Sequence, residues 1–185
     1  MAKVLIPLAN GFEDIEAVAV IDVLRRGGVD VMTASVHTTR DVRSAHGIPM
    51  KADALFADVG GDDYDAIVLP GGGEGTENLK TCVSLARRLR KQNEEKKLLC
   101  AICAAPTVLT SAGAVDAGLH LTCYPTCQTD LDREWSPAPV VAEGNVITGQ
   151  APGSAVLFAL VVLQSLMGER IAQKVARGMV TDVLD

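Results

Sequence analysis

Residues 98–109 read LLCAICAAPTVL and contain a predicted strand followed directly by a predicted helix, the order of elements that decides the fold of this chain. The apolar run that ends at Ile102 has the length and composition of a buried β-strand. Small residues follow, and because proline favours the first turn of a helix, a helix is expected to begin near Ala105-Pro106. Cys103 therefore falls at a strand-to-helix corner, the position that a nucleophile elbow gives to its attacking residue, and its thiol is expected to be exposed there.

Strands and helices are predicted to alternate on both sides of this corner. Apolar runs bounded by turn residues predict buried strands over residues 3–8, 29–35, 66–69 and 97–102. Apolar residues at helical spacing predict helices over residues 13–26, 79–95, 154–167 and 169–177. Two short runs, 140–142 and 146–148, flank a Gly-Asn turn and predict a hairpin. This order predicts an α/β fold with a mostly parallel sheet and helices on both faces.

The composition fits such a fold and excludes several classes of partner. Hydrophobic residues make up 48% of the 185 residues and aromatic residues only 3%, so a core of aliphatic side chains in a single domain over 1–185 is expected. The formal net charge of -6 provides no basic surface for nucleic acid or an anionic membrane. A basic cluster at residues 87–91 is interpreted as the solvated face of its helix.

The cysteines and the apolar runs predict a cytoplasmic protein. The beginning of the sequence lacks the pattern of a signal peptide, and the longest apolar run, 155–163, is far shorter than the roughly 20 residues of a membrane-spanning helix. In the reducing cytosol, cysteines are core residues, metal ligands or reactive thiols rather than parts of a disulfide framework. The five cysteines are Cys82, Cys100, Cys103, Cys123 and Cys127.

The carboxyl ends of parallel strands meet at one edge of the sheet, where open α/β folds bind their ligands. Unusual sequences follow four of the predicted strands, at residues 10–16, 70–73, 103–106 and 150–153. The glycines of Pro70-Gly71-Gly72-Gly73 let backbone N–H groups approach a ligand, as an oxyanion hole requires, although a tight turn also explains them. The phosphate-binding motifs of nucleotide-binding proteins are not present there.

Two side chains at this edge are candidates for chemistry. A helix N-terminus beside Cys103 is expected to lower the pKa of its thiol, whereas Cys100, inside the strand, is expected to be an inert core thiol. Glu16 lies deeper than Glu13 and Asp14 in the predicted helix and points towards the same edge. A carboxyl group in an apolar site beside a thiolate has a raised pKa and can act as a general acid or base.

Three alternatives are weaker. In a thioredoxin-type pair the first cysteine stands at the helix N-terminus, whereas here the second one does. A cysteine protease needs a histidine near its cysteine, and His120 is better explained as an exposed strand residue. The group His120, Cys123 and Cys127 has zinc-like residue types but lacks paired CxxC motifs, so ordinary thiols explain it better and no metal or cofactor is expected.

Four segments together resemble the ThiJ/PfpI superfamily, in the branch of the parkinsonism-associated protein deglycase and its bacterial relatives. The segments are GFEDIEAV at 11–18, VLPGG at 68–72, AICAAPT at 101–107 and GQAPG at 149–153. The resemblance extends over essentially the whole chain. It implies a flavodoxin-like three-layer sandwich, similar to the class I glutamine amidotransferases, that forms a homodimer.

The resemblance also implies roles for four residues. It makes Cys103 the reactive thiol, makes Glu16 the carboxyl group hydrogen-bonded to it, and assigns oxyanion binding to the backbone N–H groups of Gly72 and Ala104. The implied activities are the glutathione-independent conversion of methylglyoxal or glyoxal to hydroxy acids and the repair of early glyoxal adducts on proteins or nucleotides. Oxidation of Cys103 in a stress sensor, or a holdase chaperone activity, is the alternative.

Two positions depart from relatives within the superfamily. The protease branch has a histidine directly after the elbow cysteine, where this chain has Ala104, so peptidase activity is disfavoured. A second branch has a histidine before a proline near the site, where this chain has Tyr124. A mechanism that depends on a histidine base is therefore not expected, and Glu16 is left to move protons.

Overall fold

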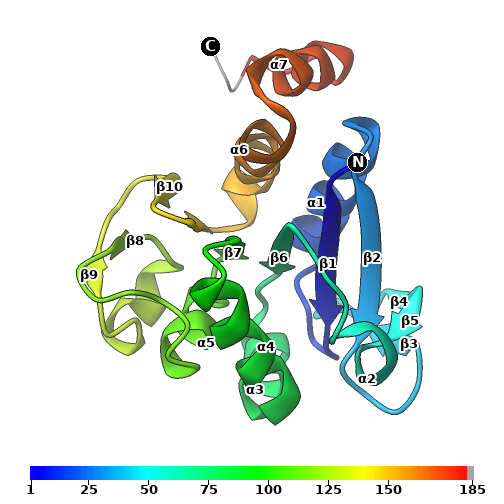
Figure 1. The fold of residues 1–185 in the computed structure, drawn as a ribbon, viewed down its shortest axis with the longest axis vertical. Coiled ribbons are helices and arrows are strands. Elements are labelled where there is room, and N and C mark those ends of the chain that lie inside the picture. The colour runs from blue at the N-terminus through cyan, green and yellow to red at the C-terminus, as the bar shows by residue number, and fades with distance from the viewer. Residues whose placement is uncertain (183–185) are drawn as a thin grey trace.

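A computed structural model describes residues 1–182 of the chain. A seven-stranded sheet forms its centre, and only the edge strand β10 is antiparallel to its neighbour (Figure 1). In spatial order the strands are β10 (Val140–Glu143), β11 (Val146–Gly149), β7 (Leu98–Ile102), β6 (Ala66–Leu69), β1 (Lys3–Leu8), β2 (Asp30–Ser35) and β5 (Ala54–Leu55). The predicted mostly parallel sheet and the predicted hairpin are confirmed.

Helices cover both faces of this sheet and create two separate cores (Figure 1). One face carries α1 (Asp14–Arg26), α6 (Ala155–Met167) and α7 (Glu169–Gly178). The other carries α2 (Phe56–Val59), α3 (Gly73–Thr81), α4 (Val83–Glu94) and α5 (Pro106–Ser111). The strands between them are buried on both sides, which explains their continuous apolar sequences. These three layers confirm the predicted flavodoxin-like α/β sandwich.

Short elements surround the main sheet. They are the antiparallel pair β3 (Asp41–Arg43) and β4 (Pro49–Lys51), the parallel pair β8 (His120–Leu121) and β9 (Glu134–Trp135), and the 3-10 turns η1 (Pro125–Asp130) and η2 (Pro152–Ser154). None of the helices in the described part of the chain is long and apolar enough to cross a membrane.

Two expectations about the second predicted helix are wrong. The single helix over 79–95 is in fact two helices, α3 and α4, which meet at an extended Cys82. The hydroxyl of Thr81 donates to the Asn78 carbonyl, a local bond that competes with helix continuation. The basic cluster is also not wholly solvated, because Arg88 is buried with Leu85 and Leu89.

Candidate active site

Cys103 occupies a strained corner between β7 and the helix α5. Its φ of +64° lies in the left-handed region that side chains rarely adopt, as expected of a nucleophile elbow. The backbone fixes this conformation, because the Cys103 N–H donates to the Gly149 carbonyl at 2.9 Å and its own carbonyl accepts from the Tyr124 N–H at 2.8 Å. The corner is thus tied to the strand β11 and to the loop after β8.

The Cys103 side chain is nearly closed off from solvent. The residue is only 8% exposed, so the expectation of an exposed thiol is wrong. The cause is close packing against Gly71 and Glu16 at the neighbouring strand end: a Cβ placed on Gly71 would lie 2.7 Å from the Cys103 Cβ and 2.8 Å from the Glu16 Oε2. Any reactant must therefore be small or must displace part of this packing.

Glu16 reaches the same corner from the first turn of α1. It is fully buried, and its Oε2 accepts a hydrogen bond of 2.8 Å from the Gly71 N–H. Within residues 1–182, its Oε1 meets no nitrogen or oxygen donor. The helix is held in place at its start, because the Glu13 side chain caps the Glu16 N–H at 2.8 Å and the Glu13 N–H donates to the Gly71 carbonyl. The Glu16 carboxyl is therefore positioned by the Gly71 N–H and by the capped start of its own helix.

The glycine turn after β6 brings backbone N–H groups to the sulfur. Gly72 has a φ of +91°, and a Cβ there would overlap the carbonyl oxygen of Gly11. With no side chain in the way, the N–H groups of Gly72 and Ala104 hydrogen-bond to the Cys103 thiol and lower its pKa. The structure thus brings together all four residues that the sequence singled out: Glu16, Gly72, Cys103 and Ala104.

Burial raises the pKa of both acidic groups of the site. Burial raises the pKa of the Glu16 carboxyl to about 7, against the opposing effect of hydrogen bonds with Gly71 and Cys103. Burial, together with the charge and hydrogen bond of Glu16, raises the pKa of Cys103 to about 12. The prediction that the helix N-terminus lowers this pKa is therefore wrong, because α5 has only six residues and burial outweighs its dipole.

This coupling has a chemical consequence. A Glu16 carboxylate repels a thiolate beside it, whereas a protonated Glu16 can donate a hydrogen bond to the thiolate. The thiolate is thus favoured only when its proton has moved to Glu16, and the pair holds one proton between its two pKa values, about 7 and about 12. The arrangement suits a nucleophile that is activated at the moment of attack by its neighbouring base.

Alanine at position 71 tests how closely the site is packed. Gly71→Ala is expected to destabilise the fold by about 1–3 kcal/mol, because the new methyl group has no space between Cys103 and Glu16. Thermal unfolding measures the effect, and reaction of Cys103 with a small thiol reagent should accelerate as the packing opens. Gly73→Ala is the matched control, since a Cβ there meets nothing within 4 Å. Equal stability of both variants would contradict the geometry.

The other candidate residues lie elsewhere. His120 is exposed on β8, as expected, and pairs with Glu143 and Glu134 at 3.2 and 3.4 Å. His37 Nε2 accepts from the Asn10 N–H. No histidine is among the groups that shift the pKa of Cys103. All five cysteines are free, and burial raises the pKa of both Cys100 and Cys123.

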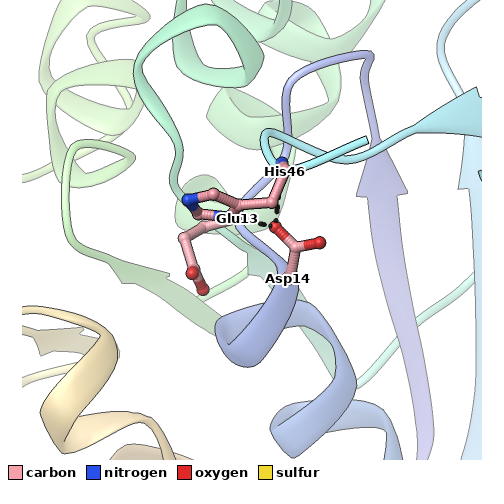
Figure 2. A group of neighbouring side chains, drawn as sticks. All are labelled: Glu13, Asp14 and His46. Carbon is pink, nitrogen blue, oxygen red and sulfur yellow. Dashed lines mark hydrogen bonds and ion pairs between the residues drawn. The ribbon is translucent and has the colours of Figure 1, made fainter. Parts of the chain in front are cut away.

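The sequence analysis missed a polar cluster beside the start of α1. Glu13, Asp14 and His46 approach one another there, and Figure 2 shows the His46 ring turned towards the Asp14 carboxylate. Asp14 accepts hydrogen bonds from the Ser44 hydroxyl and from His46 Nδ1, the latter at 2.7 Å, and this raises the pKa of His46. These contacts tie the β3–β4 hairpin to α1. Acidic residues at the helix start and a distant Ser-Ala-His stretch gave no signal of this pairing.

Within residues 1–182, this cluster is also the only group of three or more His, Cys, Asp or Glu side chains close enough to hold a metal ion. Its ligand atoms already have partners, because Glu13 caps α1 and Asp14 binds the hairpin. We therefore describe it as a hydrogen-bonded cluster that positions the hairpin.

Comparison with known proteins relates this geometry to a family. The family model described as the DJ-1/PfpI family matches residues 2–165. Protein DJ-1 homolog A of Arabidopsis thaliana is 40% identical over 181 residues, which are 94% of this chain and 45% of the plant protein. The chain thus spans less than half the length of that relative, and likewise of DJ-1 homolog B from the same plant. A glutathione-independent glyoxalase of Caenorhabditis elegans, DJR-1.2, is 35% identical, with 90% of this chain and 89% of the worm protein covered.

Solved structures agree over the whole fold. Oxidized Toxoplasma gondii DJ-1 superimposes with a TM-score of 0.94 at 35% identity, covering 98% of this chain and all of that one. Drosophila melanogaster DJ-1beta gives a TM-score of 0.93 at 36% identity, covering 97% of this chain and 98% of the fly chain. The sequence match, the fold and the four motifs at one sheet edge lead to the same conclusion: the chain belongs to the DJ-1/PfpI family.

Proposed function

We propose that this chain is a cysteine-dependent enzyme that converts reactive 2-oxoaldehydes, or their early adducts on proteins or nucleotides, without glutathione. One observation carries the proposal: a buried thiol lies between a carboxyl group with a pKa near neutrality and two backbone N–H donors. The name of the worm glyoxalase supports this reaction class. The free cysteines fit a cytoplasmic protein, and we treat residues 1–185 as one domain.

In the proposed mechanism the Cys103 sulfur attacks the aldehyde carbon of methylglyoxal as its proton moves to Glu16. The N–H groups of Gly72 and Ala104 stabilise the oxyanion of the resulting hemithioacetal, which then takes the proton from Glu16. Glu16 next removes the C1 hydrogen as a proton, which gives an enediolate, and returns it to C2, while the hydroxyl proton passes from the C1 oxygen to the C2 oxygen. C1 is thereby oxidised and C2 reduced within one molecule. Water hydrolyses the lactoyl thioester, releasing lactate and the thiol.

The surroundings of Cys103 favour this reaction over peptide hydrolysis. A cysteine protease uses a histidine to protonate the leaving amine. Ala104 follows the nucleophile here, and each histidine in the described residues has a partner other than the thiol, namely Asn10, Asp14 or Glu143. Isomerisation of a 2-oxoaldehyde needs one proton carrier, which Glu16 supplies.

The test is the conversion of methylglyoxal by the purified protein in the absence of glutathione, with lactate quantified by NMR. Stoichiometric loss of methylglyoxal and gain of lactate over many turnovers is expected. Loss of methylglyoxal without lactate would mean that the aldehyde only modifies the protein, and would contradict the proposal.

A redox sensor or holdase remains the second candidate, and the relative solved in an oxidized form favours it. In this role Cys103 would advance to sulfenic and then sulfinic acid, with Glu16 as the hydrogen-bond partner of the acid. Mild peroxide followed by mass spectrometry of Cys103, with client binding measured on the same sample, separates the roles. Selective oxidation with altered binding and no lactate production favours the sensor.

We also propose that the chain forms a homodimer through the exposed side of α1. Ile15 and Val18 form an apolar pair on this helix, and Ile48 is linked to it through Ser44, whose hydroxyl bonds both the Ile48 N–H and Asp14. Exposed apolar patches of this kind commonly mark interfaces.

Val18→Asp is expected to convert the dimer to a monomer, because a charge would be buried unpaired at the interface. Sedimentation velocity measures the change in mass. Val83→Asp is the control: Val83 is 66% exposed on α4, compared with 51% for Val18 on α1, so the same substitution there should leave the dimer intact. A wild-type monomer, or a Val18→Asp dimer, would argue against this interface.

A further inference from the structure

Arg88 on α4 is a buried cation that forms no ion pair within residues 1–182. The residue is 6% exposed, and of its three guanidinium nitrogens only Nη2 has a partner, the Asp62 carbonyl at a long 3.3 Å. Nε and Nη1 donate to nothing in residues 1–182, and no carboxylate in that part of the chain lies within ion-pair distance of Arg88. Burying donors and charge without partners destabilises a fold, so the arrangement needs an explanation.

The explanation lies in the surroundings of this side chain. Arg88 lines a surface hollow of about 280 Å³ between α4 and the turn that follows α2. Ser84, Arg87, Arg88 and Lys91 face it at the i, i+3, i+4, i+7 spacing of one helix side. Gly60 and Gly61 line it from the opposite turn. None of the lining residues is acidic.

The nearby carboxylates of Asp63 and Glu95 interact with Arg88 only at longer range, and each has a closer partner. Glu95 approaches Lys91 at 3.7 Å in an exposed pair, and Asp63 is bound to Lys97. Exposed pairs of this kind neutralise little. The Gly61 N–H, in addition, donates to no acceptor in the described residues. The hollow thus combines two exposed cations, one buried guanidinium, a hydroxyl group and a free backbone donor.

We propose that this hollow binds the phosphate group of a small phosphorylated molecule. Guanidinium groups recognise phosphate through charge-assisted hydrogen bonds, and a rotation about the terminal bonds of Arg88 would exchange its long bond to Asp62 for a phosphate oxygen. Arg87 and Lys91 supply the remaining charge, and Ser84 and Gly61 supply neutral donors. None of the residues around Cys103 lines the hollow, so this site is separate from the proposed active site.

Isothermal titration calorimetry with inorganic phosphate, at constant ionic strength balanced by chloride, tests the proposal. Saturable binding to the wild-type protein is expected, with affinity reduced about tenfold or more in Arg88→Met. Arg90→Met is the matched control, because Arg90 lies on the same helix outside the hollow and bonds the Ala112 carbonyl. Its phosphate affinity should stay within about twofold of the wild type. Turnover of methylglyoxal should be unchanged in both variants.

Two further measurements keep the result decisive. Arg88→Met is expected to unfold at the same or a higher temperature than the wild type, since methionine fills the space without an unpaired charge. If it fails to fold, Arg87→Met, which changes an exposed side chain of the hollow, replaces it and should also weaken phosphate binding. Binding of a soluble sugar phosphate, but not of phosphatidic acid vesicles, is expected. Absence of saturable phosphate binding, or equal phosphate affinities of Arg88→Met and Arg90→Met, would overturn the proposal. Binding to the vesicles alone would show that the hollow recognises a lipid headgroup and would overturn the assignment to a small soluble molecule.

Discussion

Cys103→Ser is expected to reduce kcat/KM for methylglyoxal by about a thousandfold or more, with no lactate detected above the uncatalysed rate. A serine hydroxyl can occupy the same strained corner, but its pKa is far above that of a thiol and Glu16 is too weak a base to activate it. The substitution removes one buried sulfur and leaves the backbone bonds of the corner to Gly149 and Tyr124 in place. The loss should therefore occur with a nearly unchanged unfolding temperature.

Cys100→Ala is the control for this experiment. Cys100 lies fully buried in β7, three residues before the elbow, and its thiol is part of the core. Its removal leaves a small cavity and lowers stability by about 1 kcal/mol, while lactate production should stay within about twofold of the wild type. A Cys103→Ser variant that retains full activity would exclude Cys103 as the nucleophile. Activity that disappears in both variants would indicate loss of the fold instead.

The central strands were predictable because each one is a continuous apolar run bounded by polar or glycine residues. Thus β1 and β6 match their predicted ranges, and β7 differs by one residue. Strands of two or three residues, such as β3, β5 and β9, are too short to have a period and were missed. The break at Cys82 was missed because it contains neither glycine nor proline, and a local Thr81 bond ends α3 instead.

The position of the site was predictable, but its electrostatics were predictable only for Glu16. Strand ends in a parallel sheet meet at one edge, so Cys103 and Gly72 were expected together, and the helical pattern pointed Glu16 towards them. The burial of Cys103 depends on how closely the Gly71 turn approaches, a distance that no spacing in the sequence encodes. Burial decides the pKa of both acidic groups. The raised pKa of Glu16 agrees with the prediction, whereas the raised pKa of Cys103 could not be deduced from the sequence.

The burial of Arg88 agrees with its helical spacing but not with the charge of its sequence neighbours. Leu85, Arg88, Leu89 and Gln92 follow the i, i+3, i+4, i+7 spacing of a buried helix side, and all four are buried. The four cations within residues 87–91 indicate a solvated surface, whereas the helical spacing indicates a buried position for Arg88, and the spacing is correct. A charged residue on an apolar stripe is rare enough to indicate a functional or structural partner.

Glu16→Gln is expected to change the pH dependence of both stability and catalysis. Burial raises the pKa of the Glu16 carboxyl from 4.5 to about 7, so between these values the folded protein holds a proton that the unfolded chain has released. The free energy of unfolding must then fall as pH rises through this window, and level off above about pH 7. At about 1.4 kcal/mol per pKa unit, Glu16 contributes about 3 kcal/mol to the difference in stability between pH 4.5 and pH 8.

Glutamine cannot ionise, so the variant should lose this contribution while keeping that of every other group. The comparison with the variant is needed because His46, whose pKa is raised by Asp14, also makes the free energy of unfolding fall with rising pH. Urea unfolding at several pH values, for wild type and variant, isolates the share of Glu16 as the difference of the two curves. Glu77→Gln is the control, since Glu77 is an exposed residue of α3 paired only with Lys80, and its curve should follow the wild type. Parallel curves for wild type and Glu16→Gln would show that Glu16 does not hold its proton in the folded state.

Catalysis should respond to the same proton with the opposite sign. The free enzyme needs the Glu16 carboxylate to receive the thiol proton, so kcat/KM of the wild type is expected to rise with pH around an apparent pKa of about 7. In Glu16→Gln the rate should fall by about 10²–10⁴-fold and this rising limb should disappear. The group whose ionisation weakens the fold would then be the group whose ionisation starts the reaction, which is the trade-off expected when a carboxyl group is buried for use as a base. If kcat/KM of the wild type is constant between pH 6 and pH 8, while the unfolding curves of wild type and Glu16→Gln still differ, Glu16 is a buried acid with a raised pKa but not the base of the mechanism.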